Sequence, residues 1–329
     1  MSLESILEWG VVPDVGGRGV PFGRYHGAPR AIDFTGFERG WSAVRRRFVR
    51  KAWWYAGVYT EDLVIGFAVC DAGYAGLGFA YIYDLKTGTL IEEGSHKGLA
   101  FAQNFQPQLD GKWQLDAGAG RWRVKPEDAA FAVTFQGKRL TLDLKIDHDK
   151  QGLTAIAPAG LRPFNQTYKR IGSGVSGHVV SDGVRREISG PWGAIDFTAG
   201  YPPRHTAWNW AALAGTTESG QKFGINLVGD FNAGLENALW IDDDLIPLGA
   251  CEFQYPTDPA QGPWRMMTRD GVVQLEFTPH GVRRETLDRW LVRTHFVQPF
   301  GSFSGKITTD GIIQRLRGTG VVEEHDSLW

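Results

Sequence analysis

The sequence predicts an all-β fold made of two consecutive antiparallel β-barrels, and three observations support this. The chain holds 43 glycines among 329 residues, nearly double the ordinary share, spread along it as turns would be. Short runs rich in Val, Ile, Phe, Thr and Trp lie between the glycines, and several of them alternate with polar residues. Several sequence blocks recur in the same order, and the length is about twice that of a usual domain.

Two pairs of segments predict β-hairpins. Residues 131–135 and 140–146 alternate apolar and polar side chains on either side of a short turn. Residues 79–84 and 89–92 form a comparable unit. An alternation of period two places the apolar side chains on one face of a strand, as a half-buried sheet requires.

The internal repeat indicates a duplicated β-domain. Its blocks pair residues 31–35 with 194–198, 122–135 with 264–277, 176–183 with 304–311, and 188–190 with 316–318. The offset between partners shrinks along the chain, so the first copy is expected to have longer loops. These matches predict an N-terminal extension over residues 1–30, a first barrel over 31–190 and a second over 191–329. A sheet without covering helices must hide its edges, and closure into a barrel does so and leaves room for one small ligand.

Few other elements are expected. Only residues 2–9 and 285–292 have sequences that suit short helices. The basic residues between 45 and 51 suit the solvent-facing side of a strand, although they could also contact a phosphate or a membrane surface.

Composition excludes several classes of function. Lys and Arg (35) nearly balance Asp and Glu (37), so no basic field is available to bind nucleic acid. No apolar run approaches the roughly 18 residues of a membrane span, and residues 1–12 lack the basic start of a secretory signal. Cys70 and Cys251 are expected to be buried reduced thiols. Together these features predict a cytoplasmic protein. The eight histidines show no zinc-helix spacing, so no metal is expected.

One set of motifs resembles a known family. The motifs are residues 193–200, 204–211, 224–227, 236–237 and the stretch 320–329. They resemble the bacterial family called domain of unknown function 2804, over nearly the whole chain. That family is similar to tandem lipocalin-like proteins, which include carotenoid 1,2-hydratases and tocopherol cyclases. The resemblance implies a lipophilic ligand, a pocket within or between two barrels, and no metal or organic cofactor.

Asp196 is the candidate acid. In a strand it lies on the face opposite Ile195 and Phe197, from which it could enter a pocket. An apolar cavity raises the pKa of a carboxyl group and lets it protonate an alkene, an epoxide or an enol near neutral pH. The alternative is a structural role, with Asp196 bound to Arg204 or to the backbone.

The segment that follows supplies further candidates. His205 is the proposed proton partner and Arg204 an orienting charge. Trp208 and Trp210 could form an apolar wall, although core packing explains a tryptophan equally well. In a regular strand the two tryptophans face one way and His205 the other, so a bulge or a domain interface would have to bring them together.

Polar residues inside apolar stretches complete the predicted site. Asn226 and Glu236 could bind ligand oxygens or satisfy one another, and Tyr201 is a further expected ligand contact. The acidic stretch at residues 323–326 is interpreted as ion pairing or barrel closure.

The leading hypothesis is a cofactor-independent enzyme. It would bind a terpenoid, polyene or lipid-like molecule and start a hydration, an isomerisation or a cyclisation by protonation. A carrier or sensor that uses the same cavity without chemistry is the alternative, and a carbohydrate site is a third interpretation. The glycine-rich run at residues 172–177 precedes a β-like segment and no helix, so no nicotinamide cofactor is expected.

Overall fold

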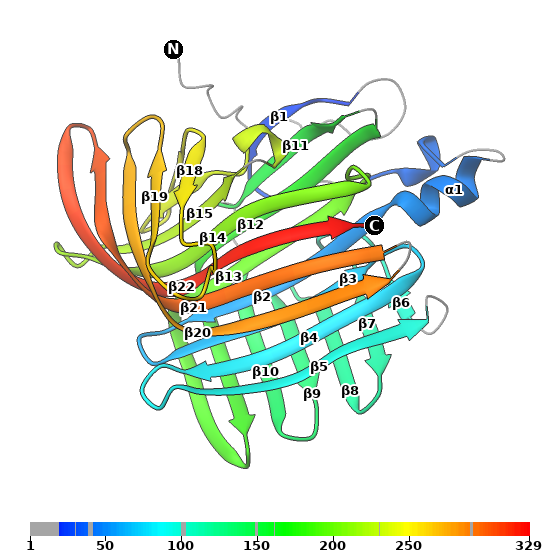
Figure 1. The fold of residues 1–329 in the computed structure, drawn as a ribbon, viewed down its shortest axis with the longest axis horizontal. Coiled ribbons are helices and arrows are strands. Elements are labelled where there is room, and N and C mark those ends of the chain that lie inside the picture. Colours follow the sequence, from blue (N-terminus) through cyan, green and yellow to red (C-terminus); the bar gives the residue numbers. More distant parts are fainter. Residues whose placement is uncertain are drawn as a thin grey trace.

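The computed structural model describes residues 20–29, 31–38, 42–99, 103–148, 151–160, 162–229, 231–289 and 292–329. In this part the chain is almost entirely antiparallel strands in two sheets, which lie side by side (Figure 1). This confirms the predicted all-β fold with two tandem barrel-like domains. No helix in these residues is long and apolar enough to cross a membrane.

The first sheet contains thirteen strands. Along its main path the order is β5 (Thr89–Leu99), β4 (Ala75–Asp84), β3 (Leu63–Asp71), β2 (Lys51–Tyr59), β13 (Val184–Gly200), β12 (Arg162–Ser181), β10 (Leu140–Asp147), β9 (Ala130–Gln136), β8 (Gly120–Pro126), β7 (Trp113–Ala117) and β6 (Gln103–Phe105). Off this path, β1 (Gly23–His26) pairs with β11 (Leu153–Ala159), which pairs with β12. Both predicted hairpins are present, as β4–β5 and β9–β10.

The second sheet contains nine strands. Their order is β17 (Asp244–Pro247), β16 (Ala238–Ile241), β15 (Lys222–Gly229), β14 (His205–Thr217), β22 (Ile312–Leu328), β21 (Val292–Thr309), β20 (Val273–Arg289), β19 (Trp264–Thr268) and β18 (Cys251–Gln254). β22 therefore lies in the middle of this sheet, where it pairs with β21 on one side and with β14, far upstream in sequence, on the other.

The repeat is clearest in two long hairpins, β12–β13 and β21–β22. Each turns through an Asp-Gly pair with positive φ at both residues, Asp182 (47°) and Gly183 (82°) in one and Asp310 (51°) and Gly311 (77°) in the other. Two-residue turns of this type match the twist of paired strands. In the first sheet, β10 lies between β9 and the β12–β13 hairpin. In the second sheet, β20 pairs directly with β21 of the β21–β22 hairpin. The longer first copy thus includes an additional strand.

Three expectations differ from the structure. Residues 285–289 belong to β20 and Val292 begins β21, and these two strands pair with each other, so the described residues of 285–292 are strand rather than the expected helix. The basic stretch begins in a helix, α1 (Ser42–Val49), and the Lys51 side chain is buried in β2. The repeat block at residues 31–35 leads into a short 3₁₀ turn that begins at Phe34, whereas its partner block at 194–198 lies in β13, so the two blocks differ in local structure. The helix expected at residues 2–9 lies outside the described residues.

The change from one sheet to the other occurs between Gly200, the end of β13, and His205, the start of β14. β13 runs through residue 190, where the sequence places the domain boundary, and belongs to the first sheet over its whole length. β1 likewise brings part of the predicted N-terminal extension into that sheet.

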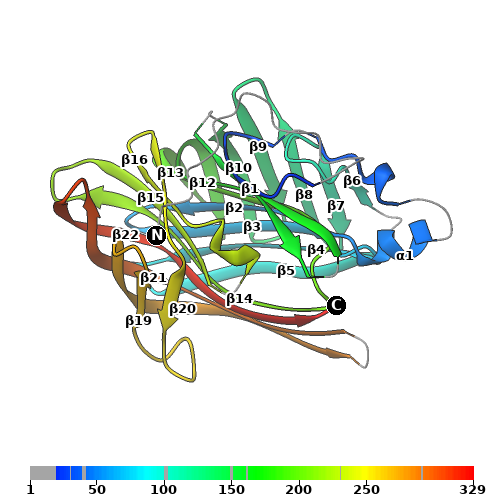
Figure 2. The ribbon, with the colours of Figure 1, turned by 90° about the horizontal axis from the view of Figure 1, so that it is seen from above.

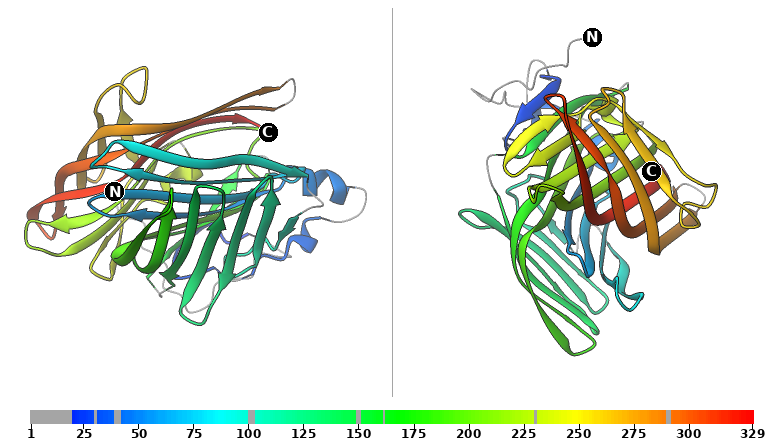
Figure 3. Two further views of the ribbon diagram at one scale, coloured as in Figure 1. Left: turned by 90° about the horizontal axis from the view of Figure 1, so that it is seen from below. Right: turned by 90° about the vertical axis from the view of Figure 1, so that its left-hand side faces the viewer.

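Three buried apolar clusters hold the fold together. One lies in each half of the chain, and the third joins residues of both sheets, including Tyr81, Trp210 and Phe300. Figures 2 and 3 show the curved sheets from other sides. Strands of the second sheet lie next to β2–β5. The backbones of the two sheets are in close contact at Gly224, where an added Cβ would lie 2.2 Å from the Ile171 carbonyl oxygen.

Candidate functional site

A cavity of about 220 Å³ lies between the two sheets. Its walls come from β2, β3, β4, β12 and β13 of the first sheet and from β14, β15, β20, β21 and β22 of the second. The sequence left open whether the pocket lies within one barrel or between two, and this cavity is of the second kind. Most of its lining is apolar or aromatic.

The first sheet presents a row of polar side chains to the cavity. Lys169 on β12, Asp196 on β13 and Tyr55 on β2 are direct cross-strand neighbours, so the pleat places all three on one face. All three line the cavity. The predicted orientation of Asp196, opposite the buried Ile195 and Phe197, is confirmed.

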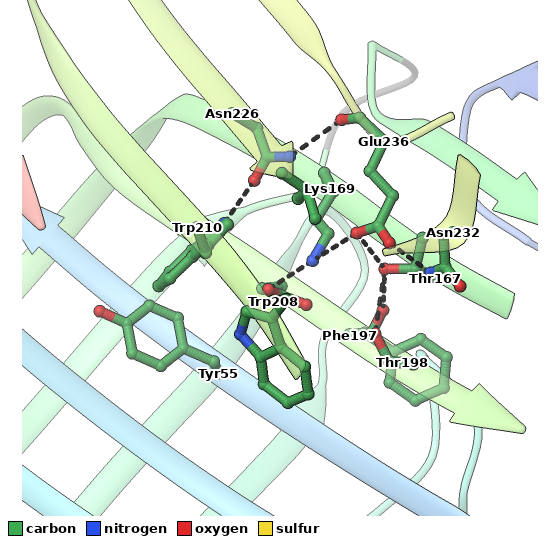
Figure 4. A network of polar contacts seen from close by, with 12 residues as sticks. Tyr55, Thr167, Lys169, Phe197, Thr198, Trp208, Trp210, Asn226, Asn232 and Glu236 are labelled. Carbon is green, nitrogen blue, oxygen red and sulfur yellow. Dashed lines mark hydrogen bonds and ion pairs between the residues drawn. The ribbon is translucent and has the colours of Figure 1, made fainter. Parts of the chain in front are cut away.

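Lys169 binds two carboxylates. Its Nζ lies 2.5 Å from Asp196 Oδ2 and 2.9 Å from Glu236 Oε2. Glu236 also accepts hydrogen bonds from Asn232 Nδ2 and, at 3.4 Å, from Thr167 Oγ1 (Figure 4). Burial alone would lower the pKa of Lys169, but the two carboxylates raise it above its ordinary value. Lys169 therefore stays charged between two acids.

Asp196 has an altered acidity. Burial raises its pKa to about 6, against the opposing effect of Lys169 and with help from Glu236 and Glu323. Its Oδ1 atom is buried and has no hydrogen-bond partner. A protonated carboxyl group is therefore accessible near neutral pH in a largely apolar site.

The second sheet presents a matching face. Trp208 and Trp210 on β14 lie across from His325 and Glu323 on β22. Glu323 accepts hydrogen bonds from Trp208 Nε1 at 2.8 Å and from Gln298 Nε2 at 3.0 Å. The imidazole of His325 stacks on Trp208, with ring centres 3.9 Å apart.

Aromatic rings from both sheets meet across the cavity. Trp53 stacks near Trp208 with ring centres 5.8 Å apart, and Tyr55 meets Trp210 edge-on at 5.3 Å. The arrangement suits an apolar ligand held between flat surfaces, and indole faces also stabilise positive charge that develops on such a ligand.

The structure brings together four of the residues named from sequence. Asp196, Trp208, Trp210 and Glu236 all line the cavity. Asn226 lies behind them, where its Oδ1 accepts a hydrogen bond from Trp210 Nε1 at 2.8 Å and its Nδ2 donates to the Glu236 carbonyl at 2.9 Å. Asn226 thus holds the wall in place through the Glu236 main chain, while the Glu236 carboxylate binds Lys169 rather than Asn226.

Three named residues lie elsewhere. His205 is on the opposite face of β14 from Trp208, is 60% exposed and binds Asp326 at 2.9 Å, because no bulge reverses the alternation there. The expected pairing of His205 with Asp196 is therefore corrected. Arg204 is exposed in the bend before β14, and Lys169 takes the place expected for it beside Asp196. Tyr201 is buried among Phe34, Phe37 and Phe164 and donates to Glu38 at 3.0 Å.

Sequence reasoning missed Lys169, Glu323 and His325. The stretch 323–326 was interpreted as ion pairing, yet strand alternation sends Glu323 and His325 into the cavity while Asp326 binds His205 outside it. That alternation was the available signal. For Lys169 the sequence offered no such signal, because only the pairing of β12 with β13 places it beside Asp196.

No group of three or more His, Cys, Asp or Glu side chains that could hold a metal occurs within the described ranges. Cys70 lines the cavity, and burial raises the pKa of its thiol to about 12, so it is a poor nucleophile.

The comparison with family models decides the classification. The model of a domain of unknown function, DUF2804, matches residues 18–329. The chain belongs to this family. No curated protein matches the sequence of this DUF2804 member.

Solved structures share its fold at low identity. A Nitrosomonas europaea protein assigned the name AttH has a TM-score of 0.56 and 15% identity, over 90% of this chain and 96% of that one. Kievitone hydratase from Nectria haematococca has a TM-score of 0.53 and 17% identity, over 87% and 92% of the two chains. CghA has a TM-score of 0.52 and 11% identity, over 84% and 87%. The DUF2804 chain thus has the two-part β-fold of these proteins over nearly their full lengths.

Proposed function

We propose that this protein binds a hydrophobic small molecule in the cavity between its sheets and starts a reaction by protonating it. The observation that carries the proposal is Asp196, a buried carboxyl group whose pKa is raised to about 6 and which lines an aromatic cavity. At pH 7 roughly one molecule in ten carries this proton, which suffices for an acid that is replenished from solvent.

The chemistry follows from the surroundings of Asp196. The carboxyl proton passes to one carbon of a ligand C=C bond, whose electron pair forms the new C–H bond and leaves a cation on the other carbon. Water then adds to the cation and loses a proton, which completes a hydration. Loss of a neighbouring C–H proton, or attack by a second C=C bond of the ligand, gives isomerisation or cyclisation instead.

Neighbouring residues support each stage. Lys169 holds Asp196 Oδ2 and stabilises the carboxylate left after proton transfer. The indole rings of Trp208 and Trp210 line the cavity, and their π-electrons stabilise the positive charge of the cation. Glu236 binds Lys169 and keeps it in place. The structural similarity to a protein named kievitone hydratase supports water addition as one outcome within this fold.

The test compares Asp196→Asn with the wild-type protein in D₂O. Kievitone and a panel of neutral terpenoid alkenes serve as substrates, and mass spectrometry counts carbon-bound deuterium in the products. Turnover should fall by about 100-fold or more, the usual contribution of a general acid. Binding of the neutral fluorescent probe 1-aminoanthracene should change less than about 3-fold, because Asn keeps the shape of the cavity.

Asp326→Asn is the matched control, since it removes a carboxylate that binds His205 outside the cavity. Its turnover should equal that of the wild-type protein. Probe binding without deuterium uptake from any substrate would favour the carrier or sensor alternative, and a sugar recovered from the purified protein would favour the carbohydrate interpretation.

A further inference from the structure

His325 lies in the cavity with one ring nitrogen unused. Its Nε2 is 2.6 Å from Ser327 Oγ, and Ser327 in turn donates to Thr294 Oγ1 at 3.2 Å. Since the Ser327 hydroxyl proton is given to Thr294, its oxygen accepts, and Nε2 must carry the imidazole proton. Nδ1 is then the unprotonated nitrogen, and it is buried without a hydrogen-bond partner.

Glu323 is placed to stabilise a proton on that nitrogen. Its Oε1 lies 3.7 Å from His325 Nδ1. Trp208 and Gln298 donate to its two oxygens, and Tyr81 fixes Gln298 by donating to its Oε1 at 2.7 Å. These bonds hold Glu323 as a fixed carboxylate, so a cation formed at His325 meets a negative charge already in position.

We infer that His325 is the proton acceptor of the site, oriented by Ser327 and stabilised by Glu323. The inference rests on the proposed function and adds a division of labour to it. The first sheet supplies the acid, Asp196, and the second sheet supplies the base, His325. No functional role beyond ion pairing follows from the sequence for either Glu323 or His325.

The proton balance closes over one turnover. Asp196 gives a proton to a ligand carbon and becomes a carboxylate. In a hydration, water forms a C–O bond to the cation, and its surplus proton goes to the Nδ1 lone pair. In an isomerisation or a cyclisation, a C–H bond breaks, its electron pair becomes the new C=C bond, and the proton goes to the same atom. Solvent then returns a proton to Asp196 and removes one from His325.

The first experiment is ¹⁵N NMR of histidine-labelled protein, with the His325 signals assigned from their loss in His325→Gln. Neutral His325 should show a protonated Nε2 and an unprotonated Nδ1. In Ser327→Ala the acceptor of the Nε2 proton is removed, so the spectrum should shift to a mixture of the two tautomers. A neutral His325 with its proton on Nδ1 in the wild-type protein would overturn the inference.

The second experiment is turnover of the kievitone and terpenoid panel. His325→Gln and His325→Phe should each lose about 100-fold or more, while 1-aminoanthracene binds within about 3-fold of wild type. His205→Gln is the matched control, because His205 lies outside the cavity, and should retain full turnover. Equal turnover by the wild-type protein and both His325 variants overturns this inference alone. Failure of the wild-type protein to convert any substrate overturns the proposed function and the inference with it.

Discussion

At the scale of single residues, the cavity concentrates charge where the fold would gain more from apolar side chains. Asp196, Glu236 and Glu323 are each less than a tenth exposed, and Lys169 is the cation that binds two of them. Buried ion pairs seldom add stability beyond what well-packed apolar residues give. Their presence in one cavity therefore supports the chemical role proposed for it.

Replacing Asp196 should change how stability depends on pH. The folded-state pKa of about 6 lies above the ordinary 3.8, so between these values the folded protein binds more protons than the unfolded chain. The free energy of unfolding of the wild-type protein should therefore fall relative to that of Asp196→Asn as pH rises from about 4 to about 6. The two-unit shift corresponds to a change of about 3 kcal/mol at most. Urea unfolding at several pH values measures it, and parallel profiles would contradict the assignment.

At the scale of elements, strand pairing decides which residues meet. Neighbouring strands bring Lys169, Asp196 and Tyr55 into one row, and a second pair of strands does the same for Trp208 and His325. The two rows come from different sheets, so packing of one sheet against the other completes the site.

Gly224 provides a test of that packing. A methyl group there would lie 2.2 Å from the Ile171 carbonyl oxygen, and backbone on both sides leaves little room to yield. Gly224→Ala should therefore destabilise the protein by about 3 kcal/mol. Gly183→Ala is the control, because its site is open and only the positive φ of 82° is strained, at about 1 kcal/mol. Urea unfolding of both variants checks the order, and equal losses would show that the sheets can separate at Gly224.

Sequence reasoning predicts the local features and misses those that depend on contacts between distant segments. The alternation around Asp196 correctly predicted which way its side chain faces, and the repeat aligned the segments that form the two long hairpins. The partner of Asp196 could not be found in the same way, because Lys169 is 27 residues away and apposed only by pairing. His205 was proposed because an imidazole can exchange a proton near neutral pH, but no bulge interrupts the strand alternation, which turns its side chain outward.

At the scale of the whole molecule, the two sheets share their interior. Arg283 on β20 binds Glu92 on β5 at 2.7 Å, and Tyr81 on β4 donates to Gln298 on β21. The third apolar cluster contains residues from both halves. The cavity therefore exists only while both sheets are folded and in contact.

Ligand binding should consequently stabilise the whole protein at once. A saturating probe at about 100 times its Kd adds about 2.7 kcal/mol to the free energy of unfolding. With 1-aminoanthracene, circular dichroism and tryptophan fluorescence should report one transition that shifts upward together. Ala68→Phe fills part of the cavity and should abolish the shift. Two transitions, of which only one responds, would indicate that one sheet alone forms the binding site.

The late position of β22 also constrains how a newly made chain acquires its site. Trp208 and Glu323 touch across 115 residues of sequence, and the strand that carries Glu323 and His325 lies in the middle of the second sheet. While the ribosome is still adding residues 312–328, β14 and β21 have no strand between them. The proposed acid on β13 is thus synthesised well before the proposed base on β22. Until residues 312–328 have been added, the nascent chain contains the acid but not the base.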